Sequence, residues 1–338
     1  MTEETVFENI NELKDIVKSN YGIKITSIKK IIRGSANIYS LNNNKYILKE
    51  FQSNYKKEDI IKEITVINHL KKNKIKVPKY IKTLKGDSYF FYKDKYIILQ
   101  KYIDGYTKEQ NTGNINETLE SAKYLGKIVK ALKSLNYNLN KIDYLGWLNT
   151  ETLNNAINKY KSLIKNLDLK NELDKKIYYD LNDKIKMINC IKNKFNKEEI
   201  NNLTIVNSHG DYSVMQFIYK NKKIHAVIDF VAAAKVPIIW EIIRSYSYID
   251  EDVKNGEFNI NTFIKYVKTV NKYITLNEYD IKYMPYLYLV QMLNSDYGYK
   301  EYINNKTKKE LLNFAIFRTK LCRYLFKNSE LISKELRK

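Results

Sequence analysis

The stretch that decides the fold reads H-G-D-Y-S-V-M-Q-F-I-Y over residues 209–219 and, after a short polar turn, I-H-A-V-I-D-F-V-A-A-A-K-V-P-I-I-W-E over residues 224–241. It places Asp211 directly after a His-Gly pair, an amide at Gln216, and a second acid, Asp229, at the end of an apolar run. Carboxylate and amide oxygens are ligands that Mg²⁺ accepts. Two acids and an amide on adjacent backbone segments therefore indicate a site for Mg²⁺ and a nucleotide.

Composition predicts a globular protein with a sizeable core. The chain has 338 residues, of which 44% are hydrophobic and 29% charged. That length allows two domains or one body with two lobes. The net charge of +21 attracts phosphates, nucleic acids and anionic lipid surfaces. Its lysines are spread along the whole chain, however, and no arginine-rich arm or RNA-recognition signature accompanies them. We therefore expect no specific nucleic-acid partner.

Cysteine usage and the amino terminus indicate a cytoplasmic protein. Cys190 and Cys322 lie far apart and outside any metal-ligand spacing, so neither a disulfide framework nor a zinc site is indicated. The first ten residues are acidic and amphipathic, unlike a signal peptide. No apolar run approaches the roughly 20 residues that span a bilayer. We expect no membrane insertion and a monomer or homodimer.

Hydrophobic periodicity divides the chain into a strand-rich part and a helix-rich part. The first part ends near Asp104-Gly105, and convincing strands return only at residue 203. The predicted organisation is an amino-terminal lobe over 1–103, a linker over 104–116 and a helical lobe over 117–338 that contains a hairpin over 203–230. Within the first lobe the sequence predicts helices over 2–19 and 56–72 and strands over 23–33, 37–41, 45–51, 88–92 and 96–103.

One lysine and one glutamate in the first part are predicted to pair. Lys49 ends the apolar triplet Tyr46-Ile47-Leu48, so a rigid strand holds it, and a lysine on a buried strand face needs an anionic partner. Glu63 lies at the border of the apolar stripe of the helix over 56–72, from which it can point inward at the sheet.

Together these features resemble the aminoglycoside phosphotransferase and choline kinase-like branch of the protein-kinase-like fold. The family pattern is His-Gly-Asp, four residues, an Asn, then a hairpin to Ile-Asp-Phe and a Pro followed by an acid. Here the pattern is matched over residues 209–241, with Gln216 where Asn is usual and with Ser213 where a second His is common. The resemblance implies an α+β fold with two lobes, a small antiparallel-sheet N-lobe and a large, mainly helical C-lobe.

The resemblance also implies a chemistry. Phosphoryl transfer needs positioned groups that neutralise charge: a lysine on the phosphates, an acid that holds it, a metal cradle and a base for the hydroxyl. By analogy Asp211 is the catalytic residue, Gln216 and Asp229 hold Mg²⁺, and Lys49, fixed by Glu63, contacts the phosphates of ATP, with GTP as the alternative. The remaining nucleotide contacts implied by the family are Gly34, Ser35 and Asn37 over the triphosphate, and Gln100, Tyr102 and Ile103 at the adenine.

The expected function is an ATP-dependent small-molecule kinase, which transfers the γ-phosphate to a hydroxyl of a small metabolite or antibiotic. Two alternatives remain open at this stage. A catalytically degenerate kinase-like scaffold, for example a spore-associated protein, fits Gln216, the single glycine of the phosphate loop and the 30 tyrosines. Nucleic-acid binding fits the charge alone.

The acceptor is not identified by the sequence. A polycationic aminoglycoside requires an acidic pocket, which a local cluster of acids can supply against the net charge, and a neutral or anionic hydroxylated metabolite is an equally open alternative. Several smaller expectations concern residues 209–246: His209 braces its loop, Trp240 and Tyr246 belong to the core, and Glu241 pairs with Arg244. Acids that a cationic substrate would need are available at Asp250, Glu251, Asp252, Glu257, Glu278, Asp280, Asp296 and Glu301.

Overall fold

The computed structural model describes residues 4–31 and 36–338. By its internal contacts the chain divides into two compact units. The first comprises Met1–Thr107, Ser134–Leu139 and Gln216–Ala233, and the second comprises Lys108–Lys133, Asn140–Met215 and Ala234–Lys338. The lobe boundaries at 103 and 117 stay a prediction.

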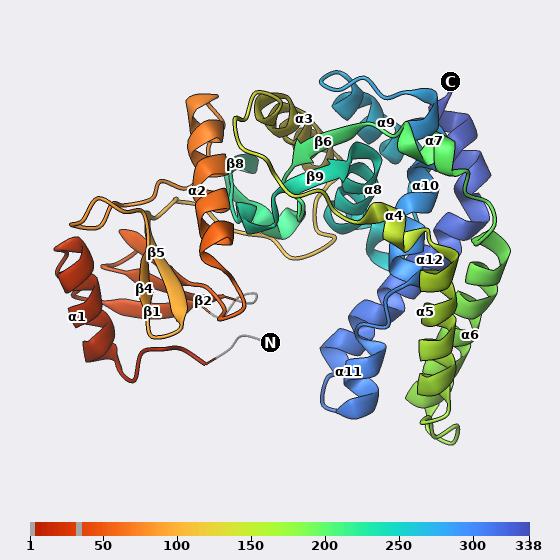
Figure 1. Cartoon of the computed structure of the whole chain (residues 1–338), viewed down its shortest axis with the longest axis horizontal. Helices are drawn as coiled ribbons and strands as arrows, with labels where there is room; N and C mark the ends of the chain where they lie inside the picture. Colours follow the sequence, from red (N-terminus) through yellow and green to blue (C-terminus); the bar gives the residue numbers. More distant parts are fainter. Residues whose placement is uncertain (1–3, 32–35) are drawn as a thin grey trace. The chain divides into compact units, whose positions relative to one another are not determined.

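The first unit is built on an antiparallel sheet (Figure 1). Its five strands lie in the order β1-β2-β3-β5-β4. Positive φ angles at Asn42, Asn43 and Asn44 form the tight turn between β2 and β3. The strands are β1 (Ile28–Ile31), β2 (Asn37–Leu41), β3 (Tyr46–Glu50), β4 (Phe90–Tyr92) and β5 (Lys95–Lys101), and the helices are α1 (Ile10–Tyr21) and α2 (Lys57–Lys72).

Strand alternation gives the sheet two apolar faces. Leu48 and Leu99 pack with Leu13 and Val17 of α1, whereas Ile98 packs with Ile60 of α2. Because successive side chains of a strand point to opposite faces, Lys49 shares the α2 face with Ile98, its partner in the β3–β5 register. The sheet thus presents one lysine to the helix that carries Glu63.

The leading helix begins later than the predicted 2–19. Asn9 caps it by accepting hydrogen bonds from the backbone amides of Asn11 and Glu12. Val6 and Phe7 precede this cap and are nevertheless buried in the core of the first unit. Their helical spacing was therefore misleading, because a polar N-cap residue that satisfies free amides sets the start of a helix.

The hairpin that follows the His-Gly-Asp turn consists of β7 (Phe217–Lys220) and β8 (Lys223–Val227), and it belongs to the first unit. The short polar turn expected between residues 219 and 224 is confirmed at Asn221-Lys222, with φ of 51° and 60°. The strand before the turn, β6 (Ile205–Ser208), instead pairs with β9 (Ala234–Pro237), which the sequence analysis missed. β9 is only four residues long and runs directly into a helix, so it carries little alternation.

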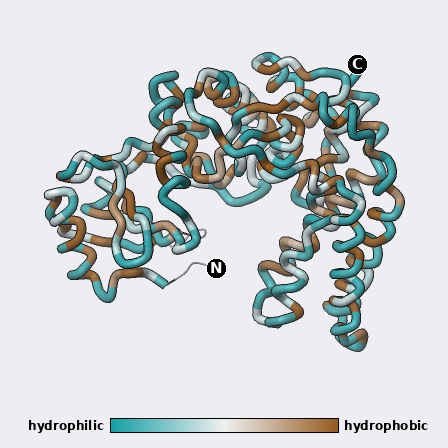
Figure 2. The backbone as a smooth tube through the Cα atoms, viewed as in Figure 1, coloured by the Kyte–Doolittle hydropathy of each residue, from teal (hydrophilic) through white to brown (hydrophobic). Residues whose placement is uncertain are grey.

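The second unit is mainly helical. Its central helix α10 (Glu278–Leu293) packs against both α8 (Ile238–Ile249) and α12 (Lys309–Leu336). Hydrophobic and hydrophilic residues alternate along the helices of this unit (Figure 2). No helix among the described residues is both long and apolar enough to cross a bilayer. The other helices are α3 (Ile115–Leu132), α4 (Tyr144–Trp147), α5 (Thr150–Ile164), α6 (Glu172–Ile191), α7 (Lys197–Asn201), α9 (Ile260–Asn271) and α11 (Tyr299–Asn304).

One glycine allows the hairpin to join the first unit. Gly105 has φ of 147°, and a Cβ there would lie 2.3 Å from the backbone oxygen of Tyr219. We expect Gly105→Ala to lower the free energy of unfolding by about 2–3 kcal/mol, because a backbone atom cannot move aside cheaply. In Gly86→Ala, where φ is 89° and nothing lies within 4 Å, only backbone strain of about 1 kcal/mol is expected. Urea denaturation of both variants measures the difference, and equal costs would contradict the close approach.

Candidate active site

Lys49 is the centre of a buried ionic cluster in the first unit. Its Nζ lies 3.4 Å from Oε1 of Glu63 on α2 and 2.8 Å from Oδ1 of Asp229. The Lys49 side chain is 12% exposed and that of Glu63 only 2%. The predicted Lys49–Glu63 pair is therefore formed, and Asp229 joins it from 180 residues further along the chain.

The two carboxylates stabilise the positive charge of Lys49. Burial alone would lower the pKa of Lys49, but the carboxylates of Asp229 and Glu63 outweigh burial and raise it, so the ammonium stays charged. Burial raises the pKa of Glu63, whereas Lys49 acts in the opposite direction. Nζ of Lys49 also lies 4.4 Å from the ring centre of Phe51, where a cation–π contact adds to its stabilisation. The ammonium is thus a fixed positive charge held by a rigid strand.

Asp229 and Gln216 lie at the same end of the β7–β8 hairpin. Phe217 pairs with Val227, and one step beyond this pair the amide of Ile228 donates to the carbonyl oxygen of Gln216 over 2.9 Å. Asp229 follows directly, with φ of 64°, a left-handed conformation that Asp tolerates better than most residues. Its side chain is 38% exposed and remains accessible.

These residues fit a magnesium ion that keeps other ligands. Asp229 supplies a half-exposed carboxylate, and Gln216, half-buried beside it along the hairpin, supplies a carbonyl oxygen. In residues 4–31 and 36–338 no group of three His, Cys, Asp or Glu side chains forms a complete metal cage. Mg²⁺ is commonly bound by one or two carboxylates together with substrate phosphates and water, and such a site needs no cage.

The other predicted nucleotide contacts lie on or beside the sheet. Gln100 is half-buried on β5 opposite Ile47. Tyr102 and Ile103 follow β5 directly and are half-buried, and the amide of Tyr102 donates to the carbonyl of Lys45 over 3.1 Å. Gly34 and Ser35 lie outside the described residues.

Asn37 occupies a different environment from the one that direct phosphate contact through its side chain would need. It is 3% exposed, and its Nδ2 donates to Oε1 of Glu50 over 3.2 Å. Glu50 is fully buried and also pairs with Lys95 at 3.1 Å. Only the backbone of Asn37 is therefore available for the predicted role.

In the second unit the His-Gly-Asp turn is held by a buried carboxylate. Glu241 is fully buried, and its two oxygens accept the backbone amides of Gly210 at 2.7 Å and Tyr212 at 3.1 Å. Nδ1 of His209 accepts the amide of Asp211 at 3.2 Å, so this histidine braces the loop as predicted. Gly210, between His209 and Asp211, has φ of 78°, a backbone conformation that a tight turn uses. The turn thus presents Asp211 in one orientation.

The carboxylate of Asp211 is 41% exposed and pairs with the guanidinium of Arg244. Burial alone would lower the pKa of Arg244, but Asp211, together with Tyr288, Tyr248 and Glu241, outweighs burial and raises it. The predicted pair between Glu241 and Arg244 is therefore wrong, because Glu241 satisfies loop amides and Arg244 binds Asp211. Sequence reasoning missed the Arg244–Asp211 contact, whose only signal was an arginine one turn after Glu241 on α8. Trp240 and Tyr246 are 4% and 0% exposed, which confirms them as core residues.

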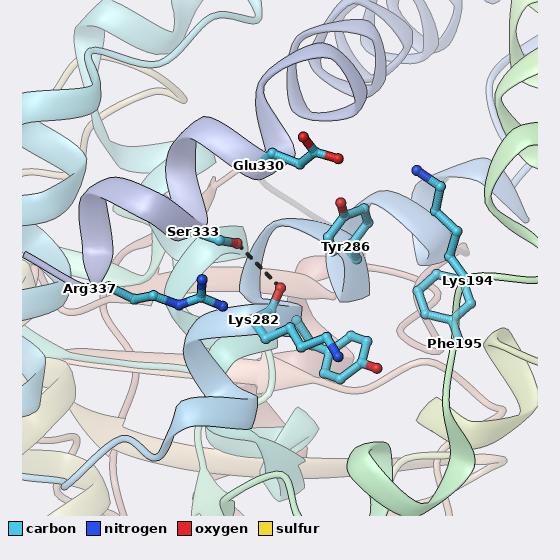
Figure 3. A pocket seen from close by; sticks show the side chains of 8 residues that line it. Lys194, Phe195, Lys282, Tyr286, Glu330, Ser333 and Arg337 are labelled. Carbon is cyan, nitrogen blue, oxygen red and sulfur yellow. Dashed lines mark hydrogen bonds between the residues drawn. The ribbon is translucent and has the colours of Figure 1, made fainter.

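A separate cavity of about 370 Å³ in the second unit contains none of these groups. Figure 3 shows its lining, in which Oγ of Ser333 donates to the backbone oxygen of Lys282 over 3.3 Å. Nζ of Lys282 pairs with Glu199 at 2.5 Å, so its charge is already matched. The lining residues are Lys194, Phe195, Lys282, Tyr283, Tyr286, Glu330, Ser333 and Arg337.

Comparison with known proteins identifies the chain's relatives. The model of the phosphotransferase enzyme family matches residues 27–259. No curated protein sequence matches the chain. Three solved structures cover nearly all of it at low identity, which shows a common fold: a spectinomycin phosphotransferase (16% identity, TM-score 0.66, 95% of this chain and 98% of that one), an amicoumacin kinase (13%, 0.62, 97% and 94%) and a microcompartment-associated aminopropanol kinase (11%, 0.61, 96% and 99%). The predicted two-lobed α+β, protein-kinase-like fold is confirmed.

We predict that Glu241→Gln destabilises the protein by about 2 kcal/mol. The amide of Gln offers one acceptor in place of two, so one buried backbone N–H loses its partner. Urea denaturation measures the loss, and Glu330→Gln, an exposed residue on α12, is the matched control with an expected change below about 0.5 kcal/mol. Equal stability of the Glu241 variant and wild type would contradict the role of this carboxylate in holding the turn.

Proposed function

The chain belongs to the phosphotransferase enzyme family and is thus a phosphotransferase whose acceptor is a hydroxyl group of a small molecule. On that premise we propose that ATP is the phosphoryl donor and that it binds together with Mg²⁺. The observation that carries the proposal is the Lys49 ammonium, fixed by Glu63 and Asp229 on a rigid strand. A fixed positive charge beside a metal-binding carboxylate is what a triphosphate requires. Two of the structural relatives support nucleotide use, one bound to ADP and one to AMP-PNP with Ca²⁺.

In this proposal the first unit binds the donor. Lys49 contacts the α- and β-phosphates, and Glu63 keeps its ammonium in place. Asp229 and Gln216 hold Mg²⁺, which neutralises the charge that develops on the phosphates. Gly34, Ser35 and the backbone of Asn37 cover the triphosphate, and Gln100, Tyr102 and Ile103 line the adenine site. ATP is the proposed donor, with GTP as the alternative.

Asp211 orients the acceptor hydroxyl and accepts its proton. The bond between the γ-phosphorus and the bridging oxygen of ATP breaks, and a bond from the γ-phosphorus to the acceptor oxygen forms. ADP leaves, and the hydroxyl proton passes to the carboxylate of Asp211. This role requires an accessible carboxylate in a fixed orientation. Its 41% exposure and the loop amides held by Glu241 support it.

The two predicted roles are separable by experiment. We expect Asp229→Asn to raise the dissociation constant of Mg²⁺–ATP at least tenfold, because a neutral amide holds a metal less well. Asp211→Asn should bind Mg²⁺–ATP normally but lose at least a hundredfold in phosphotransfer, the typical contribution of a general base. Thermal shift measures the first effect, and ADP release with spectinomycin, aminopropanol and glycerate as trial acceptors measures the second.

Asp94→Asn, at an exposed turn residue between β4 and β5, is the control for both measurements. If neither Mg²⁺–ATP nor Mg²⁺–GTP gives a thermal shift with the wild-type protein, the kinase assignment fails and a scaffold role takes its place. If Asp211→Asn turns over as fast as wild type, Asp211 is not the base.

A further inference from the structure

Two arginines and several aromatic rings form one connected group in the helical unit, here called the arginine–aromatic cluster. Residues 240, 244 and 248 lie four apart on one face of α8, and residues 314 and 318 do so on α12. α4 adds one more ring, so that three helices contribute. The cluster comprises Trp147, Trp240, Arg244, Tyr248, Phe314 and Arg318.

Arg244 connects the cluster to Asp211. Its guanidinium carbon lies 5.5 Å from the ring centre of Trp240 and 5.3 Å from that of Tyr248. One terminal nitrogen, NH2, binds Asp211. The other, NH1, is buried and has no hydrogen-bond partner. A buried donor on a charged group that lacks a partner is destabilising, so Arg244 carries an unused capacity to bind an anion.

Arg318 carries a second unused donor. Its guanidinium lies 5.6 Å from the ring centre of Phe314, which in turn stacks on Tyr248 at 6.1 Å. NH1 donates to Oγ of Ser295 over a long 3.3 Å, and Nε is buried without a partner. Among the residues that the structure describes, no carboxylate forms an ion pair with Arg318. Its positive charge is therefore stabilised mainly by rings and one hydroxyl.

Some of the acids that a cationic acceptor would need are engaged by other groups. Asp250 is 2% exposed and accepts the amide of Asp252 at 3.0 Å, while Asp252 accepts the side-chain amide of Asn259 at 3.1 Å. Asp280 is fully buried and accepts the amide of Thr204 at 2.9 Å.

Two further acids lie close to the loop that follows α10. Glu301 accepts the amide of Gly298 at 2.5 Å. Asp296, next to Ser295, is half-buried but is not an ion-pair partner of Arg318. Four of the eight acids named from the sequence thus accept hydrogen bonds from backbone or side-chain amides, and the ion-pair partner of Asp211 is an arginine, Arg244.

We propose that the acceptor carries an anionic group, a carboxylate or a phosphate, and that Arg244 and Arg318 bind it. The inference rests on the proposed function, since it concerns the acceptor that Asp211 serves. Guanidinium groups bind carboxylates and phosphates through their N–H edges, and Arg244 and Arg318 each have one N–H group without a partner. Arg244 then bridges the anion and Asp211, which places a nearby hydroxyl of the same molecule at the base. A polycation would meet two like charges here.

The two tryptophans provide a direct readout. The chain has only these two, Trp147 and Trp240, and their rings lie 5.8 Å apart within the cluster. Intrinsic fluorescence is measured during titration with D-glycerate, glycerol 3-phosphate and inorganic phosphate as anions, glycerol as the neutral analogue, and 3-amino-1-propanol and spectinomycin as cations. We expect a saturable change with the anions only, and the comparison of glycerate with the two phosphates tells which anion is preferred.

Variants on α12 assign the response to Arg318. Arg318→Met, which keeps the length and removes the charge, should weaken the response to the preferred anion at least tenfold, and Arg318→Lys should restore part of it. Arg337→Met, at an exposed arginine directly after the same helix, should bind as wild type. Circular dichroism confirms that each variant is folded.

The outcomes separate this inference from the proposed function. If a cationic amino alcohol binds and is phosphorylated while the anions have no effect, the inference is overturned and the kinase assignment stands. Absence of a saturable response to all three anions, in protein that Mg²⁺–ATP still stabilises, also overturns it, as does an unchanged response in Arg318→Met. Failure of Mg²⁺–ATP to stabilise the protein contradicts the proposed function. The fluorescence response to the anions then tests only whether Arg244 and Arg318 bind an anion.

Discussion

The first unit depends on one buried ammonium. Lys49 lies on the α2 face of the sheet because strand alternation places it there, and removing a charge from water is expensive unless opposite charges surround it. Glu63 and Asp229 supply those charges from a helix and from the end of a hairpin that lies far along the chain. Leaving Lys49 without either acid would cost several kcal/mol, so the same contacts that keep the ammonium charged also fix the hairpin end. The proposed donor site is therefore part of what stabilises the unit.

In the second unit, the hydrogen bonds of the His-Gly-Asp turn orient one carboxylate, that of Asp211. The two carboxylate oxygens of Glu241 accept hydrogen bonds from the backbone amides of Gly210 and Tyr212, and His209 accepts one from the amide of Asp211. These bonds define the turn while leaving the Asp211 side chain 41% exposed. Arg244, one turn after Glu241 on α8, contacts the carboxylate of Asp211. The identity of the residue at this position decides which charge an acceptor meets beside Asp211.

Much of the fold could be predicted because local signals agreed with each other. Alternating apolar residues and Asn or Lys turns predicted the sheet and the second hairpin, and the spacing of Asp211, Gln216 and Asp229 predicted the family that the family model confirms. The Lys49–Glu63 pair followed from a lysine on a buried strand and a glutamate at the border of an apolar stripe. These inferences need only neighbours in sequence or the two periodicities of helix and strand.

The remaining features depend on contacts that periodicity does not encode. β9 was missed because a four-residue strand gives no pattern, and α1 was extended backwards because Val6 and Phe7 pack without helix. Glu241 and Arg244 were predicted to pair with each other because they lie one turn apart on one helix, and the sequence does not tell which nearby group each of them binds instead. The metal site remains a proposal, since Gln216 stands where the family usually has Asn.

In the proposed donor site, Lys49 is the fixed positive charge that binds a nucleotide triphosphate together with Mg²⁺. Isothermal titration of AMP-PNP into wild type and Lys49→Met, with and without Mg²⁺, tests it most directly. We expect wild type to bind AMP-PNP only with Mg²⁺, and the affinity to fall at least tenfold in Lys49→Met. Equal affinity of the two proteins, or affinity that does not depend on Mg²⁺, would contradict it.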